Sequence, residues 1–552
     1  MKVQLVAIAM TCGLSLGGPV TLAHAASPSS AAAPDERCAQ LATIGLKDVE
    51  IVGAHLETGG PVTGASMPSL SAVSTTAGPP ITGLPAFCRV IGRIHPEPKS
   101  DIGFEVWLPR DGWTGRLTGA GSPGAAGSIL YYMLTAAVRG GQAGVSNDGG
   151  HHGDVEDTSW APGHPERLRD FGWRATHLSA IAAKALVARY YGKPADHAYF
   201  LGISNGGRQA LVEASRFPED YDGIMAGAPV PDWTGTRMAQ LWPQQVQSFP
   251  GASIRPAQAK VLQAEVLRQC DQLDGQHDGL VDDPRRCHVD TAKLACGNAA
   301  LPDCFTPAQI AALDSIYAGR RDKQGQWVAV PYLPAGSEIS DPLFGWDRIL
   351  FTQGEAADQA RGDQPVQTLD GQTVATIGKF NFDRDPAQYR SASAAGGFDP
   401  TPDLRRFFAR GGKLIIWHGW ADTAIPPQMA IEYYEKVRHI SGARSATSLR
   451  LFMIPGMQHG FGGKGADLFG GMMAPPKNAV PESDMAAALQ AWVETGRSPD
   501  SVVGKRHSAG ATESGAPPAR SPRERLLCAY PNRAVLKPGS DPDKGSSYSC
   551  AK

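Results

Sequence analysis

Residues 197–217 read HAYFLGISNGGRQALVEASRF, and this stretch decides the fold of the chain. Ser204 stands at the centre of a G-x-S-x-G, after a short apolar and aromatic run and before a segment with helical spacing. A nucleophile elbow requires this strand–turn–helix context. The turn is tight, so glycine is favoured on both sides of the serine, where a Cβ would not fit. The pentapeptide alone is also compatible with a glycine-rich loop that carries an incidental serine.

Strands and helices alternate around this elbow. A helix is expected over 174–191, ended by Gly192 and Pro194. Alternation of this kind favours a parallel sheet and an α/β fold. Strands are expected at 102–108, 197–201, 223–227, 413–417 and 449–454.

The alternation of strand-like and helix-like segments stops after Pro229 and resumes at 413. Residues 232–400 are rich in Gly, Pro, Asp and Gln and show no βαβ repetition. We therefore predict one α/β core, formed by 26–231 and 401–552, with 232–400 inserted as a lid. Residues 505–522 have the composition of a surface loop.

The N-terminus has the pattern of a secretory signal peptide over residues 1–25. Lys2 precedes an apolar stretch, and Ala23-His24-Ala25 forms an A-x-A cleavage site. The alternative is a membrane anchor, but glycines and a proline interrupt the apolar stretch. Residues 26–36 are rich in Ala, Ser and Pro and are expected to be disordered. The sequence thus predicts a secreted or periplasmic protein.

Charge and cysteine usage fit an exported globular protein of 552 residues. The formal net charge of −2 gives no electrostatic reason to expect a nucleic-acid partner. Eight cysteines remain after the signal peptide, and an even number favours disulfides. They allow 105 pairings, of which the sequential one is the simplest. None of them forms a CxxC motif, so the sequence does not favour a zinc site. The eight are Cys38, Cys88, Cys270, Cys287, Cys296, Cys304, Cys528 and Cys550.

An acid and a histidine follow the serine in the order that an α/β-hydrolase triad requires. Asp422 comes directly after the strand expected at 413–417, and His459 directly after the strand at 449–454. Such a histidine takes the proton from the serine, and the aspartate holds the imidazole tautomer. Each residue alone is also compatible with an ordinary loop position, but the ordered set of three favours catalysis.

Two glycine-rich loops complete the candidate site. One oxyanion donor is expected from the backbone N–H of Asn205, which follows the nucleophile. The second is expected from the loop at 119–127, where we select Gly124 because Pro123 has no N–H. The loop NDGGHHGD at 147–154 could suggest a metal site, but adjacent histidines face one ion poorly, which favours a polar loop near the active site.

Long motifs resemble the tannase/feruloyl esterase family of serine esterases, which includes mono(2-hydroxyethyl) terephthalate hydrolases. The similarity runs from FGWRATHL at 171 through the elbow to MAGAP at 225–229, and continues in HGWADTAIPP, IPGMQHGFGG and LLCAYPNRAVLKPGSD. The resemblance implies an α/β-hydrolase fold with a lid between serine and acid, and a triad of Ser204, Asp422 and His459. It also implies a small aromatic ester as substrate.

The chain departs from the family at two positions beside the triad. Members usually carry a cysteine before the serine and another after the histidine, joined in a disulfide. Here these positions are Ile203 and Gly460. The loss of both partners together predicts that packing around Ile203 holds the two catalytic loops.

A calcium site is implied by the resemblance, at DQLDGQHDGLVD over 271–282. Without it, three aspartates in eight residues are compatible with a solvated acidic turn. The family pattern assigns Asp271, Asp274 and Asp278 as side-chain ligands, with Gln276 and Leu280 contributing backbone carbonyls, and Ca²⁺ favours such oxygens. Cys270 and Cys287 bracket the loop.

The sequence therefore predicts an exported ester hydrolase that forms an acyl-enzyme on Ser204 under a calcium-stabilised lid. Alternatives are a broad-specificity esterase, a tannin-type depsidase, and a non-catalytic binding protein on the same fold. The ordered triad disfavours the last of these. Neither nucleic acid nor a membrane is expected as a partner, and the sequence gives no oligomeric state.

Overall fold

The computed structural model of the chain describes residues 34–62, 66–68, 77–125, 127–297, 303–339, 344–346, 360–506 and 523–552. The expected signal peptide lies outside these ranges, as do residues 507–522 of the expected surface loop and 26–33 of the expected disordered segment. Residues 34–36 of that segment correct the prediction, because they begin helix α1 (Pro34–Gln40). Buried Cys38, bonded to Cys88, fixes this helix to the sheet.

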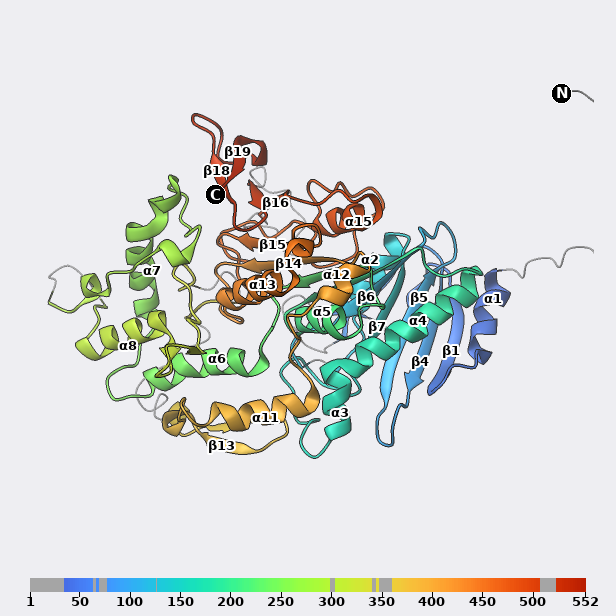
Figure 1. Cartoon of the computed structure of the whole chain (residues 1–552), viewed down its shortest axis with the longest axis horizontal. Coiled ribbons are helices and arrows are strands. Elements are labelled where there is room, and N and C mark those ends of the chain that lie inside the picture. The colour runs from blue at the N-terminus through green and yellow to red at the C-terminus, as the bar shows by residue number, and fades with distance from the viewer. Residues whose placement is uncertain are drawn as a thin grey trace, which may run out of the picture.

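A nine-stranded sheet in the order β1-β4-β5-β7-β6-β8-β9-β14-β15 forms the centre of the molecule (Figure 1). The expected strands are present as β5, β8, β9, β14 and β15. Their order places β8, which leads to the elbow, between β6 and β9. The strands are β1 (Val49–Glu57), β4 (Phe87–Ile94), β5 (Ile102–Pro109), β6 (Arg116–Gly121), β7 (Ala143–Asn147), β8 (His197–Ile203), β9 (Gly223–Gly227), β14 (Lys413–Gly419) and β15 (Leu449–Ile454).

The sheet is mixed, which corrects the expectation of a parallel sheet. The pairs β1–β4, β4–β5 and β5–β7 are antiparallel, whereas β7, β6, β8, β9, β14 and β15 run parallel. β4 and β5 are joined by the short link 95–101, which holds no crossover helix, so they can only pair antiparallel. The carboxyl ends of β6, β8, β14 and β15 meet at one edge of the sheet, where the candidate site lies.

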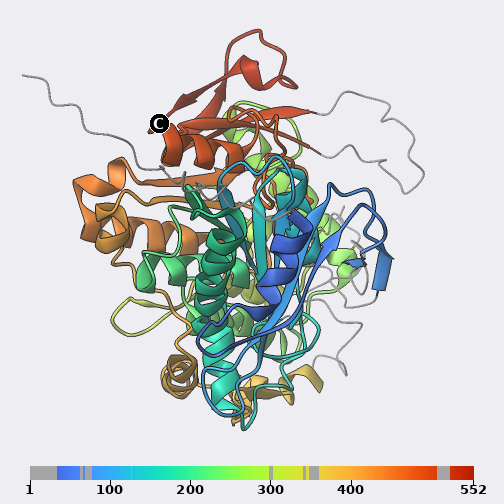
Figure 2. The ribbon, with the colours of Figure 1, turned by 90° about the vertical axis from the view of Figure 1, so that its right-hand side faces the viewer.

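Helices cover both faces of the sheet. β8 shows the arrangement, because Ala198 and Phe200 join one buried cluster and Tyr199 and Leu201 the other. One face is covered by α4 (Ala175–Tyr191), α5 (Asn205–Arg216) and α13 (Pro427–Ser441), and the other by α2 (Tyr131–Arg139) and α15 (Met485–Thr495). Figure 2 looks onto the β1 end, with α1 in front of the sheet.

The chain between β9 and β14 forms a separate helical layer beside the sheet (Figure 1). It has a core of its own, in which buried residues such as Leu262, Leu313 and Trp346 pack together. Its elements are α6 (Trp233–Gln247), α7 (Pro256–Cys270), α8 (Pro307–Ala318) and α11 (Pro386–Gly396), with ribbons β10 (Arg320–Arg321) to β11 (Trp327–Ala329) and β12 (Pro365–Gln367) to β13 (Thr373–Thr376). The short helix α12 (Arg405–Ala409) precedes β14 and packs Phe407 and Phe408 into the core of the sheet instead.

Four disulfides join the cysteines in sequential order: Cys38–Cys88, Cys270–Cys287, Cys296–Cys304 and Cys528–Cys550. The last one ties together two C-terminal ribbons that project from the core (Figure 2). Within the described ranges, no helix has the length and apolar character needed to cross a membrane. The remaining elements are β2 (Ser66–Pro68), β3 (Ala77–Pro80), α3 (Pro165–Arg169), α14 (Ala443–Ala446), β16 (Ser501–Lys505), β17 (Glu524–Cys528), β18 (Arg533–Leu536) and β19 (Tyr548–Ala551).

Candidate active site

Ser204 lies at the tip of the turn that joins β8 to α5. Its backbone has φ 61° and ψ −122°, a conformation that costs a non-glycine residue about 1–3 kcal/mol. The flanking glycines are required: a Cβ on Gly202 would lie 2.3 Å from the carbonyl oxygen of Gly206, and one on Gly206 would lie 2.6 Å from that of Gly121. This strained serine between crowded glycines has the geometry of a nucleophile elbow rather than of an incidental loop.

Asp422 and His459 lie in the loops after β14 and β15. These strands are parallel neighbours, so their carboxyl ends bring the two loops together. Nδ1 of His459 lies 2.7 Å from Oδ2 of Asp422, which is fully buried. Burial by itself raises the pKa of this carboxyl. The interactions with the rings of His459 and His418 lower it by more, so the pKa of Asp422 lies below its usual range. The buried carboxylate is therefore ionised and holds the hydrogen of His459 on Nδ1.

The loops that carry Ser204 and His459 touch through the two positions where the sequence lacks cysteine. A Cβ on Gly460 would lie 2.2 Å from Cδ1 of Ile203, so the isoleucine side chain occupies the space beside the glycine. Gly460 itself has φ 82°, a region that favours glycine. Ser204 follows Ile203 in the chain and His459 precedes Gly460. This apolar contact therefore brings the loops of the two candidate catalytic residues together.

We expect the double replacement Ile203→Cys with Gly460→Cys to form a disulfide under oxidising conditions. A bond between such distant residues stabilises by about 2–4 kcal/mol. The positive φ at 460 should offset about 1–2 kcal/mol of that gain for any residue with a Cβ. Thiol titration and the melting temperature with and without reductant measure both effects. The single variant Ile203→Cys is the control, and two free thiols in the oxidised double variant would contradict the contact.

The glycine-rich loop after β6 is braced against the elbow. Asn205, which is buried, donates from Nδ2 to the carbonyl of Ser122 at 3.1 Å. The N–H of Ser122 donates to Gln209, and that of Ala125 donates to the carbonyl of Val155. In the described part of the chain, the N–H of Gly124 meets no acceptor. The choice of Gly124 as the second oxyanion donor stays a prediction.

The histidines of the loop at 147–154 diverge. His151 is buried, stacks on Trp160 with ring centroids 3.9 Å apart, and places Nε2 2.8 Å from the carbonyl of Ala125. His152 is exposed. Burial raises the pKa of Asp148 in the same loop to about 7. The two histidines do not share one metal, and His151 instead supports the loop that carries Gly124.

Two aromatic residues beside His459 were not identified from the sequence. The ring of Phe344, from the layer between β9 and β14, lies edge-on to the His459 ring with centroids 5.4 Å apart. The ring centroid of Phe461 lies 5.8 Å from that of Phe344. Gln458 also donates to the carbonyl of Ile339 at 3.1 Å. Phe344 belongs to the layer between β9 and β14, so its place beside His459 depends on how that layer packs on the core. No periodicity in the sequence indicates this packing.

Arg208 connects the elbow helix to the inserted layer and was also missed. It is fully buried and donates to Oδ1 of Asn205 at 2.7 Å. The same guanidinium donates to three backbone carbonyls, two of them on Gly172 and Phe398. It also lies over the ring of Trp233. Arg208 therefore fixes Asn205, and with it the expected oxyanion donor.

The loop at 271–282 brings several carboxylates together beside the C-terminal region. Asp278 directs Oδ2 to Arg525, while its Oδ1 is buried and meets no hydrogen-bond donor among the described residues. Burial raises the pKa of Asp278, and the charges of Asp274 and Asp271 raise it further against the effect of Arg525. The pKa of Asp282, which was not among the expected ligands, is raised to about 6 by burial and by its acidic neighbours. Asp271 accepts the N–H groups of Asp278 and Gly279, and Asp274 that of Gln276. The unpaired buried oxygen of Asp278 is thus the feature that fits a hard cation such as Ca²⁺.

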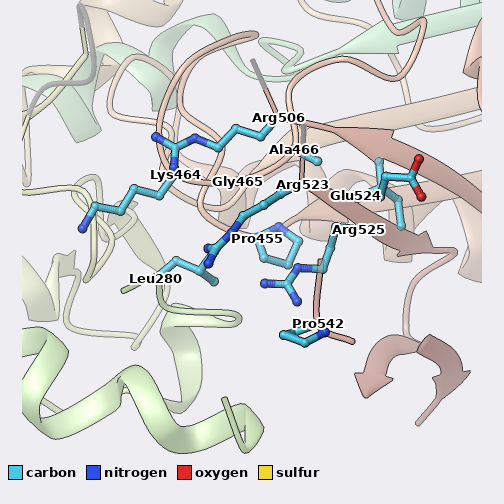
Figure 3. A pocket seen from close by; sticks show the side chains of 11 residues that line it. Leu280, Pro455, Lys464, Gly465, Ala466, Arg506, Arg523, Glu524, Arg525 and Pro542 are labelled. Carbon is cyan, nitrogen blue, oxygen red and sulfur yellow. The ribbon is translucent and has the colours of Figure 1, made fainter. Parts of the chain in front are cut away.

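The loop meets the C-terminal region at a pocket lined by basic side chains (Figure 3). Arg523 and Arg525 of this region point toward Leu280, whereas the carboxylate of Glu524 points away. Lys464, from the loop that follows His459, lines the same pocket. Ser204, Asp422 and His459 do not line it, so the pocket is a junction between the acidic loop and the core, apart from the candidate active site.

A second cluster that the sequence does not indicate lies behind the elbow helix. Among the described residues, His177, Glu213 and Asp220 form the group of metal-type ligands whose atoms converge within 4.8 Å. Nδ1 of His177 lies 2.6 Å from Asp220. Burial raises the pKa of Glu213 well above its usual value, and the charge of Asp220 adds to this shift. Neither carboxyl oxygen of Glu213 meets a hydrogen-bond donor among the described residues.

Comparison with known proteins agrees with this geometry. Residues 88–551 match the family described as "Tannase and feruloyl esterase". The chain is 34% identical to an uncharacterized esterase of Xanthomonas campestris pv. campestris, over 96% of this chain and 94% of that protein. It is 31% identical to the mono(2-hydroxyethyl) terephthalate hydrolase of Piscinibacter sakaiensis, over 85% of each.

A solved structure shows the same architecture. The crystal structure of feruloyl esterase B from Aspergillus oryzae superimposes with a TM-score of 0.77 at 26% sequence identity, covering 94% of this chain and 100% of that one. A strained elbow serine, an aspartate–histidine pair at the same sheet edge, and a family match over most of the chain lead to one conclusion. The chain belongs to the tannase and feruloyl esterase family and is a carboxylic ester hydrolase.

Proposed function

We propose that the enzyme hydrolyses esters of aromatic carboxylic acids through an acyl-enzyme on Ser204. Asp422 holds the hydrogen of His459 on Nδ1, which leaves Nε2 as the base that takes the proton of Ser204. The same nitrogen then returns the proton to the leaving alcohol, and a water molecule repeats the sequence to release the acid. The observation that carries this proposal is the hydrogen bond between Asp422 and His459. The loop of His459 also contacts the elbow, where Gly460 lies against Ile203.

The negative charge of the tetrahedral intermediate requires two donors near the serine. The first is the N–H of Asn205, at the start of α5. The second is the N–H of Gly124, which has no acceptor of its own among the described residues. Because Asn205 also bonds to Ser122, the two donors are held at a fixed separation. This arrangement is preorganised, so no rearrangement is needed as charge develops.

Two observations support an aromatic substrate. The names of the similar proteins refer to feruloyl and terephthalate esters, which are aromatic. Beside His459, Phe344 and Phe461 form an edge-to-face pair, and such rings pack favourably against another aromatic ring. A broad-specificity esterase and a tannin-type depsidase are the alternatives.

A panel of feruloyl, galloyl, terephthaloyl and acetyl esters of one alcohol tests the substrate class. We expect kcat/KM for at least one aromatic acyl group to exceed that for acetyl by more than about tenfold, which corresponds to 1.4 kcal/mol of discrimination. Equal or faster hydrolysis of the acetyl ester would favour the broad-specificity alternative and remove the aromatic assignment.

We also propose that Ca²⁺ binds the loop at 271–282. Asp271, Asp274 and Asp278 would hold it by side chain, and Gln276 and Leu280 by backbone carbonyl. The support is the unpaired, buried Oδ1 of Asp278 together with the surrounding carboxylates. Bound there, the ion would neutralise the acidic loop, which the Cys270–Cys287 disulfide and Arg525 already fix to the rest of the molecule. Its contribution is to stability, because the loop is separate from the catalytic residues.

Chelation of calcium should lower the melting temperature. An ion present at 100 times its Kd stabilises the folded state by about 2.7 kcal/mol, which for a chain of this length corresponds to a fall of about 2–3 °C on removal. Scanning calorimetry with and without EGTA measures this. Asp274→Asn should abolish the response, and Asp363→Asn, at an exposed position between β9 and β14, should retain it. An unchanged melting temperature and no calcium by elemental analysis would refute the site.

Export from the cell is the remaining part of the proposal. The four disulfides are the support, since they persist in oxidising compartments. N-terminal sequencing of the mature protein tests this, with Ala26 expected as the first residue.

A further inference from the structure

A second histidine contacts the carboxylate of the triad. His418 lies at the end of β14, four residues before Asp422, and is fully buried. Its Nε2 lies 3.1 Å from Oδ2 of Asp422 and 3.1 Å from the carbonyl oxygen of Ile425. Oδ2 is the same oxygen that binds Nδ1 of His459. One carboxylate oxygen therefore faces two imidazole rings.

The surroundings of His418 fix where its hydrogen lies. A carbonyl oxygen only accepts, so Nε2 must carry the N–H that faces Ile425. Nδ1 of His418 is buried and has no hydrogen-bond partner among the described residues. A hydrogen on Nδ1 would therefore be a buried donor without an acceptor, which is costly. The ring holds a single N–H, on Nε2, directed at Asp422 and Ile425.

This completes the set of donors around Asp422. Oδ1 accepts the backbone N–H groups of Ala424 at 2.7 Å and Ile425 at 2.9 Å. Oδ2 accepts from His459 and His418. Donors on both oxygens prevent rotation of the carboxylate and draw charge away from Oδ2.

We infer that His418 is a positioning residue, which orients Asp422 toward His459 and limits the charge that Asp422 presents to it. The inference rests on the triad proposed above. The titratable groups that face Asp422 are His418 from β14, His459 from the loop after β15, and Tyr332 from the layer between β9 and β14. Burial, and then the charge of Asp422, raise the pKa of Tyr332, so its hydroxyl stays protonated and does not titrate with the base.

Replacement of His418 by phenylalanine keeps a ring and removes the N–H. Without this donor, Asp422 presents more negative charge to His459, which favours the protonated form of His459. The acid limb of kcat/KM, which reports the free base, should therefore move to higher pH by about 0.4 to 1 unit. We also expect kcat to fall about tenfold with KM unchanged.

Two further variants separate positioning from packing. His418→Gln places an amide N–H near the position of Nε2, so it should keep the wild-type acid limb and most of kcat. His439→Phe, the same replacement at an exposed position of α13, should change neither. Equal losses of kcat in the Phe and Gln variants, without a shift of the acid limb, would show a packing role and overturn the inference. A His418→Phe enzyme with full activity and the wild-type acid limb would overturn it too.

The proton position can also be observed in the wild-type enzyme, whether or not the variants fold. With ¹⁵N-labelled histidine, the ring of His418 should show a protonated Nε2 and an unprotonated Nδ1. The opposite tautomer would overturn the inference. Failure of the triad itself is distinguishable, because Ser204→Ala and Asp422→Asn would then remain active.

Discussion

Replacement of Ser204 by alanine should lower kcat by at least about 10⁴-fold, because the proposed acyl-enzyme could no longer form. Some acceleration over water remains, since the oxyanion donors and the binding groups are intact. The fold should be retained: the positive φ of Ser204 is strained for alanine and serine alike, and neither residue has a long side chain to place.

The matched control is Ser215→Ala, the same replacement on the elbow helix, where the hydroxyl donates to the carbonyl of Val212. This variant should hydrolyse esters at nearly the wild-type rate. Steady-state rates are measured on preparations whose circular dichroism and melting temperature match the wild type. A folded Ser204→Ala enzyme within tenfold of wild-type activity would show that another group attacks the ester.

Replacement of Asp422 by asparagine should lower kcat by about 10⁴-fold with a smaller effect on KM. The backbone N–H groups of Ala424 and Ile425 require an acceptor, so the amide oxygen turns to them and the NH₂ group faces His459. Nδ1 of His459 must then accept, and its hydrogen moves to Nε2. In that tautomer Nε2 cannot take the proton of Ser204.

The control for this variant is Asp403→Asn, where the carboxylate pairs with Arg405 at the surface. It should leave kcat unchanged. A pH–rate profile on both variants gives the comparison. Retention of more than a tenth of wild-type kcat by Asp422→Asn would mean that Asp422 does not set the tautomer of His459.

Local chemistry made much of this fold predictable from the sequence. The strands that lead to Ser204, Asp422 and His459 are apolar on both faces, so each was visible as a short run followed by a loop. The elbow glycines were visible because the turn leaves no room for a Cβ. The sequential disulfides agree with the simplest pairing, since each pair closes a short or moderate segment.

Long-range packing was not predictable in this way. The antiparallel strands β1 and β4 pair through the register of distant residues, which no local pattern specifies. Phe344 and Arg208 act through contacts with segments far away in the sequence. The motif around Asp422 contained His418, but only the structure shows that its Nε2 meets the same oxygen as His459. The roles of the triad residues stay predictions until they are tested.

Covalent labelling tests the acyl-enzyme on Ser204 most directly. The enzyme is treated with a fluorophosphonate, digested, and mapped by mass spectrometry, with and without a slowly hydrolysed feruloyl ester as competitor. The account predicts one label for each molecule, on the peptide that contains Ser204, with loss of activity in proportion and protection by the ester. Labelling of another residue, or full ester hydrolysis by an enzyme labelled on Ser204, would contradict it.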